Sequence, residues 1–277
     1  MKTSTNTKGN FFNAFYKLFS SVALILFCKM CFAQVEPTWN KGAFIFPEDL
    51  AKEFGTPIGN VAVLEKYMPL FEKAVLTNKY KPAILMHGCG GISRENIEHA
   101  KLLASMGIPV FLPSYYARSD AQTLCAGSSS GAVLFINISR QDVYQRIEEF
   151  EYAVKKLREL QFIDASQILA TGHSMGGLTV AQVKNSSVGA AVITGWGCFG
   201  NFSGQSPKHI PQLAIRFKVD PFLSSSESCE AKFFSGREKQ NTFSVVLDGQ
   251  QTHEVMHNDQ AKDEIRKFVS EFFVRKK

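Results

Sequence analysis

Several features are scarce in this 277-residue sequence, and each scarcity excludes a class of protein. Ten prolines and twenty glycines are too few for a collagen-like or low-complexity chain. No stripe of basic residues with interleaved aromatics is present, so we expect no nucleic-acid partner. Beyond residue 33 no hydrophobic run approaches the roughly 20 residues that span a membrane. Internal repeats and linkers are also missing. What remains is 45% hydrophobic and 20% charged, as in a globular protein.

The first 33 residues differ from the rest. They hold four of the 31 basic residues and no acidic one. A lysine-bearing polar stretch leads to an apolar run at 18–28, and Cys31-Phe32-Ala33 has the small-x-small pattern of a signal peptidase site. This order predicts a secretory signal that is cleaved near Ala33. A membrane anchor is the alternative, but Lys29 interrupts the run too early. We therefore expect a periplasmic or secreted protein whose mature chain, 34–277, is one domain that does not insert into a membrane.

Four cysteines remain after residue 33, namely Cys89, Cys125, Cys198 and Cys229. An even number in an exported chain permits disulfides, although the sequence leaves the pairing open. Cys89 either pairs with Cys125 or packs as a thiol, and the same alternative holds for Cys198 and Cys229. Since no pair among the four has C-x-x-C spacing, we expect no metal.

Short apolar runs alternate with helical patterns from residue 82 onward. Strands are expected at 82–88, 108–112, 168–171, 190–194, 213–217 and 243–247, and helices at 93–106, 142–160, from 175, and 259–274. The clearest helix is 142–160, where apolar residues recur every three or four positions. Such alternation predicts an α/β fold with a mainly parallel sheet covered by helices on both faces. Residues 34–80 look less regular and are expected to flank the leading edge of the sheet.

The segment Gly172-His173-Ser174-Met175-Gly176 is G-x-S-x-G between an expected strand and an expected helix. This context is typical of a nucleophile elbow, in which a tight turn exposes the serine hydroxyl. The backbone N–H of Met175 would then point at a developing oxyanion. The alternative is an ordinary turn with an idle serine.

A serine nucleophile needs a base, and the base needs an orienting acid. His253 follows the strand at 243–247, so we favour it over His257 and His209 as the base. Asp220 follows the strand at 213–217 directly and is the expected acid, with Asp248 as the alternative.

The segment His87-Gly88-Cys89-Gly90-Gly91 closes the strand at 82–88. Its glycines allow close approach to a carbonyl, and we expect the N–H of Cys89 to be the second oxyanion donor. We expect His87 to brace this loop rather than to act as a base.

Together, H-G-C-G-G, Pro113–Arg118, Arg140 with Asp142, G-H-S-M-G-G and the turn at Asp220 resemble the dienelactone hydrolase family, most closely its exported branch with a serine nucleophile. The resemblance runs from about residue 80 to 273. It implies an α/β-hydrolase fold, no metal or cofactor, and Ser174, Asp220 and His253 as nucleophile, acid and base. The namesake enzymes carry a cysteine where this chain has Ser174, and they hold a substrate carboxylate with arginines. Arg118 and Arg216 are the candidates for that role here. The alternatives are that Arg118 is structural and holds the loop that leads to Cys125, and that Arg216 is a surface residue of an edge strand.

These observations predict a serine hydrolase that cleaves a small carboxylic ester or lactone through an acyl-enzyme on Ser174. Two alternatives stay open: an exported peptidase or polyester depolymerase using the same triad, and a non-catalytic binding protein with this fold. The natural substrate and the oligomeric state leave no trace in the sequence.

Overall fold

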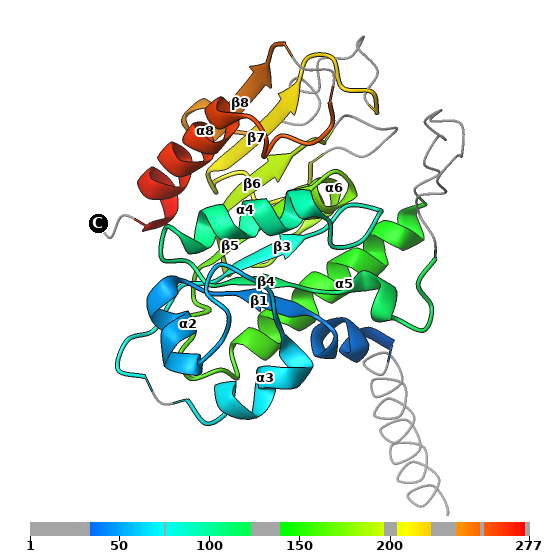
Figure 1. Cartoon of the computed structure of the whole chain (residues 1–277). Coiled ribbons are helices and arrows are strands. Elements are labelled where there is room, and N and C mark those ends of the chain that lie inside the picture. Colours follow the sequence, from blue (N-terminus) through cyan, green and yellow to red (C-terminus); the bar gives the residue numbers. More distant parts are fainter. Residues whose placement is uncertain are drawn as a thin grey trace, which may run out of the picture.

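A computed structural model describes residues 34–74, 76–122, 139–196, 204–222, 237–249 and 252–274. The expected signal at 1–33 lies outside the described residues. The described chain forms an α/β structure around one eight-stranded sheet with the order β2-β1-β4-β3-β5-β6-β7-β8 (Figure 1). The strands are β1 Ala43–Ile45, β2 Ala62–Val63, β3 Ala83–Met86, β4 Val110–Leu112, β5 Ile168–His173, β6 Val188–Thr194, β7 Gln212–Phe217 and β8 Thr242–Leu247.

Six strands, from β4 to β8 along the sheet, run parallel, which confirms the predicted fold class. The helices between them are α4 Arg94–Ala104, α5 Arg140–Leu157, α6 Met175–Gln182 and α8 Asp259–Val269, the last continued by a π-helical turn at Ser270–Val274. Helices α5 and α6 cover one face of the sheet, and α4 and α8 cover the other. Both faces are therefore buried, as expected for parallel strands.

The N-terminal segment is more regular than its sequence suggests. Residues 34–40 are helical, α2 spans Glu48–Phe54 and α3 spans Leu64–Phe71. Between them, β1 pairs antiparallel with both β4 and β2, so this segment extends the sheet instead of only flanking it. The strands are two and three residues long, too short for an alternating pattern to appear in the sequence.

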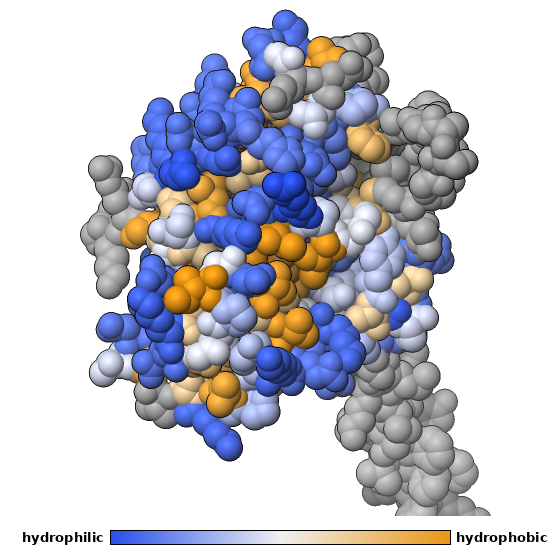
Figure 2. All heavy atoms as spheres, viewed as in Figure 1, coloured by the Kyte–Doolittle hydropathy of each residue, from blue (hydrophilic) through white to orange (hydrophobic). Residues whose placement is uncertain are grey.

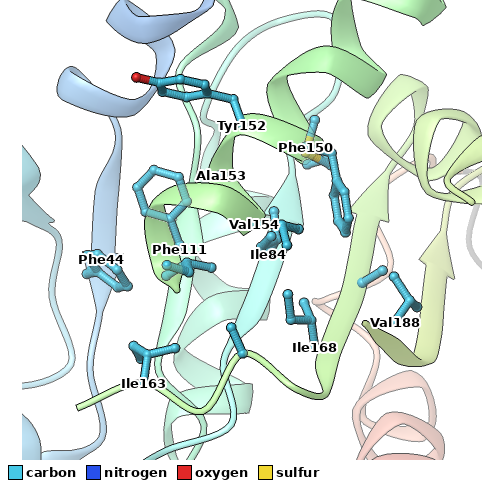
Figure 3. Close-up of a cluster of buried hydrophobic side chains, with 14 of the residues drawn as sticks. Phe44, Ile84, Phe111, Phe150, Tyr152, Ala153, Val154, Ile163, Ile168 and Val188 are labelled. Atoms are coloured by element: carbon cyan, nitrogen blue, oxygen red, sulfur yellow. The ribbon is translucent and has the colours of Figure 1, made fainter. Parts of the chain in front are cut away.

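The hydrophobic core beneath α5 explains the apolar periodicity in the sequence of this helix. Phe150 and Val154 point from α5 toward Ile84 and Ile168 on the central strands (Figure 3). A capping box between Ser139 and Asp142 satisfies the first backbone N–H groups of the helix. The apolar stripe fixes which side of α5 faces the sheet, and the capping box fixes where the helix begins.

The surface is mixed. Figure 2 shows hydrophilic side chains over most of the face seen in Figure 1, with hydrophobic ones gathered near its middle. Within the described part of the chain, no helix combines the length and hydrophobicity needed to cross a membrane.

Candidate active site

The elbow lies at the carboxyl end of β5. Ser174 follows this strand directly, precedes α6, and has φ 56° and ψ −120°. Among the described residues it alone has a positive φ without being glycine. A backbone hydrogen bond from Ser174 N to Thr194 O, 2.9 Å long, helps to hold this conformation. Such a strained backbone persists only where the surroundings enforce it, and it is common at functional sites.

Two glycines make the elbow possible. A Cβ on Gly172 would lie 2.4 Å from the backbone of Gly176, and a Cβ on Gly176 would lie 1.9 Å from the carbonyl oxygen of Met86. Since these neighbours are backbone atoms, no side-chain adjustment relieves the clash. The G-x-S-x-G pattern therefore follows from the close packing of the turn and α6 against β3.

Asp220 and His253 are paired at the same edge of the sheet. Asp220 follows β7, His253 follows β8, and Nδ1 of His253 lies 2.7 Å from Oδ2 of Asp220. The carboxyl is buried, and its other oxygen accepts the N–H of Phe222 at 2.8 Å. With a proton on Nδ1 donated to the carboxylate, neutral His253 keeps the lone pair on Nε2. That nitrogen is buried and has no hydrogen-bond partner among the described residues.

His173 connects this pair to the elbow. Its ring centroid lies 4.7 Å from that of His253, and Ser174 is the next residue in the chain. Within the described ranges the Ser174 hydroxyl makes no hydrogen bond, so it is not hydrogen-bonded to Nε2 of His253 in this structure. Catalytic hydrogen bonds are often long in a free enzyme and shorten when substrate binds.

The alternative bases and acid belong to the surface. His209 is exposed, and His257 lies 2.9 Å from the exposed carboxylate of Glu254. Asp248 lies 3.6 Å from Lys218, and both side chains are exposed. The structure thus pairs Asp220 with His253, places this pair beside the residue that precedes Ser174, and leaves the alternative residues apart.

The glycine loop after β3 passes beside the elbow. A Cβ on Gly88 would lie 3.3 Å from the Cβ of Ser174. Cys89 is disulfide-bonded, and the other cysteines lie outside the described residues, so its pairing with Cys125 stays a prediction. The hydroxyl of Tyr116 donates to the carbonyl oxygen of Cys89. Met175 is the first residue of α6, and the first N–H groups of a helix have no partner inside it, so its N–H is available as a donor to a ligand.

His87 is held by a buried arginine on α5. Its Nε2 accepts from the N–H of Tyr115 at 3.2 Å and lies 3.1 Å from Nη1 of Arg146, while Nδ1 lies 2.6 Å from the carbonyl oxygen of Gly88. Nη2 of Arg146 donates to the carbonyl oxygen of His87 at 2.6 Å. Burial, followed by the charge of Arg146, lowers the pKa of His87 well below its usual value. His87 is therefore a neutral brace in the described structure, with both nitrogens engaged.

Arg146 was not among the residues predicted from the sequence. A signal was available, because position 146 lies on the inward stripe of α5 between Val143 and Phe150. Its Nη1 is 2.9 Å from Oε2 of Glu149, and both side chains are buried. Burial raises the pKa of Glu149 to about 7, and the positive charge of Arg146 opposes this rise.

Of the two arginines considered for binding a substrate carboxylate, Arg118 is held by carboxylates of the protein itself. The guanidinium of Arg118 is buried, with Nε 2.8 Å from Asp120 and Nη2 3.3 Å from Glu148. These contacts fit the structural alternative for Arg118. Nη1 of Arg216 lies 3.4 Å from the carbonyl oxygen of Phe217.

One described group of side chains has the spacing of metal ligands. Atoms of Glu95, Glu254 and His257 lie within 4.8 Å of one another. Glu95 already accepts backbone N–H groups, and the other two side chains contact each other, so the group offers no vacant set of ligands.

Comparison with known proteins identifies the protein family. Residues 71–220, more than half of the chain, match the Dienelactone hydrolase family. The chain therefore belongs to this family of hydrolases, and its fold is the α/β-hydrolase fold.

Solved structures agree on the fold. Est1E from Butyrivibrio proteoclasticus matches with a TM-score of 0.51 and 14% identity over 72% of this chain and 90% of its own. An esterase, Est2, from Thermogutta terrifontis matches with a TM-score of 0.52 and 13% identity over 85% and 91%. A comparison with curated protein sequences finds no match.

Proposed function

We propose that the chain is a serine hydrolase that cleaves carboxylic esters or lactones of small, uncharged molecules through an acyl-enzyme on Ser174. The observation that carries this proposal is the buried pair of Asp220 and His253, whose unpartnered Nε2 lies on the ring that packs against the residue before the strained Ser174. Membership in a hydrolase family supports the same chemistry.

The proposed reaction has two steps. Nε2 of His253 takes the proton of Ser174 as Oγ attacks the ester carbonyl, and Asp220 stabilises the imidazolium that forms. The N–H groups of Cys89 and Met175 bind the oxyanion, each contributing roughly 10²–10³-fold to the rate. His253 then protonates the leaving alkoxide. Water attacks the acyl-enzyme in the second step, with His253 again as the base.

The preference for uncharged substrates depends on the arginines. Because Arg118 is bound by Asp120 and Glu148, it offers no free guanidinium to a substrate carboxylate. Aromatic rings flank the site instead. The ring centroid of Phe222 lies 4.6 Å from that of His253, and the hydroxyl of Tyr116 donates to the carbonyl oxygen of Cys89 in the glycine loop. We therefore expect neutral esters to be turned over faster than a carboxylate-bearing lactone.

Export is part of the proposal. Cys89 is disulfide-bonded, and such bonds persist in oxidising compartments. Together with the order of charged, apolar and small residues in 1–33, this supports a periplasmic or secreted enzyme.

Labelling with a fluorophosphonate tests the proposal directly. We expect the reagent to modify Ser174, as located by mass spectrometry of the peptides, and Ser174→Ala to lower ester turnover by roughly 10⁶-fold without loss of the fold. His253→Ala should prevent labelling. The matched control is His257→Ala, which removes an exposed imidazole four residues further on and should label normally.

The outcomes separate the alternatives. A folded Ser174→Ala variant with normal turnover would overturn the assignment of the nucleophile. Failure of the folded wild-type protein to label would favour a binding protein. Faster cleavage of peptide amides or of a polyester film than of small esters would favour the peptidase or the depolymerase.

A further inference from the structure

Glu95 is a buried carboxyl that the proposed reaction does not use. It is the second residue of α4 and only 1% exposed. Its Oε1 accepts the N–H of Val255 at 2.9 Å and that of Met256 at 3.0 Å, and Oε2 lies 3.1 Å from the same N–H of Met256. The carboxyl therefore binds a loop about 160 positions further along the chain instead of its own helix.

That loop carries His253. Val255 and Met256 are two and three residues after it, and their side chains are buried. Asp220 holds His253 only through Nδ1, which fixes one edge of the ring. That hydrogen bond does not by itself fix the backbone of the loop. The contacts of Glu95 add a direct connection between this backbone and α4.

The same carboxyl also reaches the elbow. Oε1 of Glu95 lies 3.8 Å from Nδ1 of His173, the residue before Ser174. The ring of His173 in turn packs against the ring of His253. One side chain from α4 thus contacts both the segment of the nucleophile and the segment of the base.

We propose that Glu95 is a positioning residue that sets the location of His253 relative to Ser174, through the backbone of the 253–256 loop and through His173. This inference rests on the proposed function of the site.

Burying the carboxyl of Glu95 costs free energy, because the charged form loses its hydration. Burial raises its pKa to about 7, although the two backbone N–H groups and His257 lower it. An apolar residue would avoid this cost but would leave the N–H groups of Val255 and Met256 without an acceptor. The carboxyl of Glu95 thus provides the acceptor for these two backbone N–H groups.

Substitutions at Glu95 test the proposal. Glu95→Ala removes both acceptor oxygens, and we expect kcat for an ester to fall about 10²-fold, as for a displacement of about 1 Å, with KM unchanged within about twofold. Glu95→Gln keeps one acceptor but places an NH₂ group against a backbone N–H, so we expect a smaller loss, about tenfold. The matched control is Glu98→Gln on the same helix, which removes an exposed carboxylate paired with Lys101 and should leave kcat unchanged.

A second measurement reads the geometry without turnover. The Nδ1 proton of His253 that is shared with Asp220 should give a far-downfield ¹H NMR signal, which Asp220→Asn would assign by removing it. In Glu95→Ala we expect this signal to shift or to exchange faster with water, whereas Glu98→Gln should leave it unchanged. Circular dichroism establishes that each variant is folded.

The results decide the two proposals separately. A folded Glu95→Ala variant with wild-type kcat and an unchanged signal would overturn the positioning role and leave the hydrolase proposal intact. If Glu95→Ala fails to fold, Glu95→Gln decides in its place, and wild-type kcat with an unchanged signal in that variant overturns the role. If the wild-type protein does not label at Ser174, the proposed function fails, and the NMR signal alone decides the role of Glu95.

Discussion

At the scale of single residues, the protein buries histidines that it must keep neutral. His87, His99 and His173 are all inside the molecule, and burial lowers the pKa of each. His87 braces the glycine loop and His173 packs on His253. His99 on α4 lies 3.4 Å from the hydroxyl of Thr171 and takes no part in the proposed reaction. The effect of this buried imidazole on stability can therefore be measured separately from any effect on the proposed reaction.

His99 should make the protein less stable in weak acid. Its pKa is lowered from 6.5 to about 4, so below pH 6.5 the unfolded chain takes up a proton that the folded protein does not. The stability that neutral His99 contributes is complete above pH 6.5 and is lost as the pH falls below it. Between pH 7 and pH 5 this loss is about 2 kcal/mol.

Urea denaturation at the two pH values checks this expectation. His99→Gln should lose about 2 kcal/mol less between pH 7 and pH 5 than the wild-type protein. His209→Gln, at an exposed position outside the core, should behave as the wild type. Equal losses in the wild type and in His99→Gln would contradict the assignment.

The same scale shows which site residues the sequence could predict. Asp220 and His253 were accessible because each follows a strand, and strands of a parallel sheet deliver their ends to one edge. For Arg146 the sequence offered only its place on the inward stripe of α5, and for Glu95 it offered no signal, since a buried polar residue can be interpreted only together with its partner. That partner is His87 for Arg146, 59 positions away, and Met256 for Glu95, 161 positions away.

At the scale of elements, α5 links the core to the glycine loop. Its apolar stripe packs on the sheet, and on the same side Arg146 donates to His87 and pairs with Glu149. The buried carboxylate of Glu149 forms an ion pair with Arg146, so among the described residues Arg146 is the main compensation for the burial of this group. Stability and loop geometry therefore depend on the same guanidinium.

A pair of variants separates these two contributions. Arg146→Met should destabilise the protein by about 3–5 kcal/mol, because it leaves Glu149 buried without a partner. Adding Glu149→Leu should recover most of that loss, since a buried ion pair is often replaceable by apolar residues. Ester turnover should stay low in the double variant, because the carbonyl of His87 still lacks its donor.

Chemical denaturation and kcat of the three proteins check this expectation. A double variant that is no more stable than Arg146→Met would contradict the role of Glu149. Full activity in the double variant would show that the glycine loop keeps its geometry without Arg146.

Prediction of the elements themselves was good where periodicity had room to appear. Helices α4, α5 and α8 and the parallel strands from β3 to β8 were expected close to where they occur. Strands β1 and β2 were missed because they are too short to carry a pattern and pair with distant β4 and with each other. Their presence reflects the open edge of β4, which tertiary pairing covers.

At the scale of the whole molecule, the fold and the family define a hydrolase, and export remains a proposal with its own test. We expect the protein recovered outside the cytoplasm to begin at Gln34, because Ala33 closes the small-x-small segment. Mass spectrometry of its N-terminal peptide checks this. Ala33→Lys should block cleavage, while Ala181→Gly, far from the segment, should not. Recovery of the chain only in the cytoplasm, with Met1 intact, would contradict export.

The order of the site residues along the chain has a consequence for synthesis. The glycine loop and Ser174 are made well before His253, which enters only with the segment between β8 and α8, near the end of the described chain. A growing polypeptide therefore carries the proposed nucleophile before the proposed base has been made. If the proposed mechanism holds, we expect no ester hydrolysis until β8 and α8 are in place, so an incomplete product should be inert toward esters.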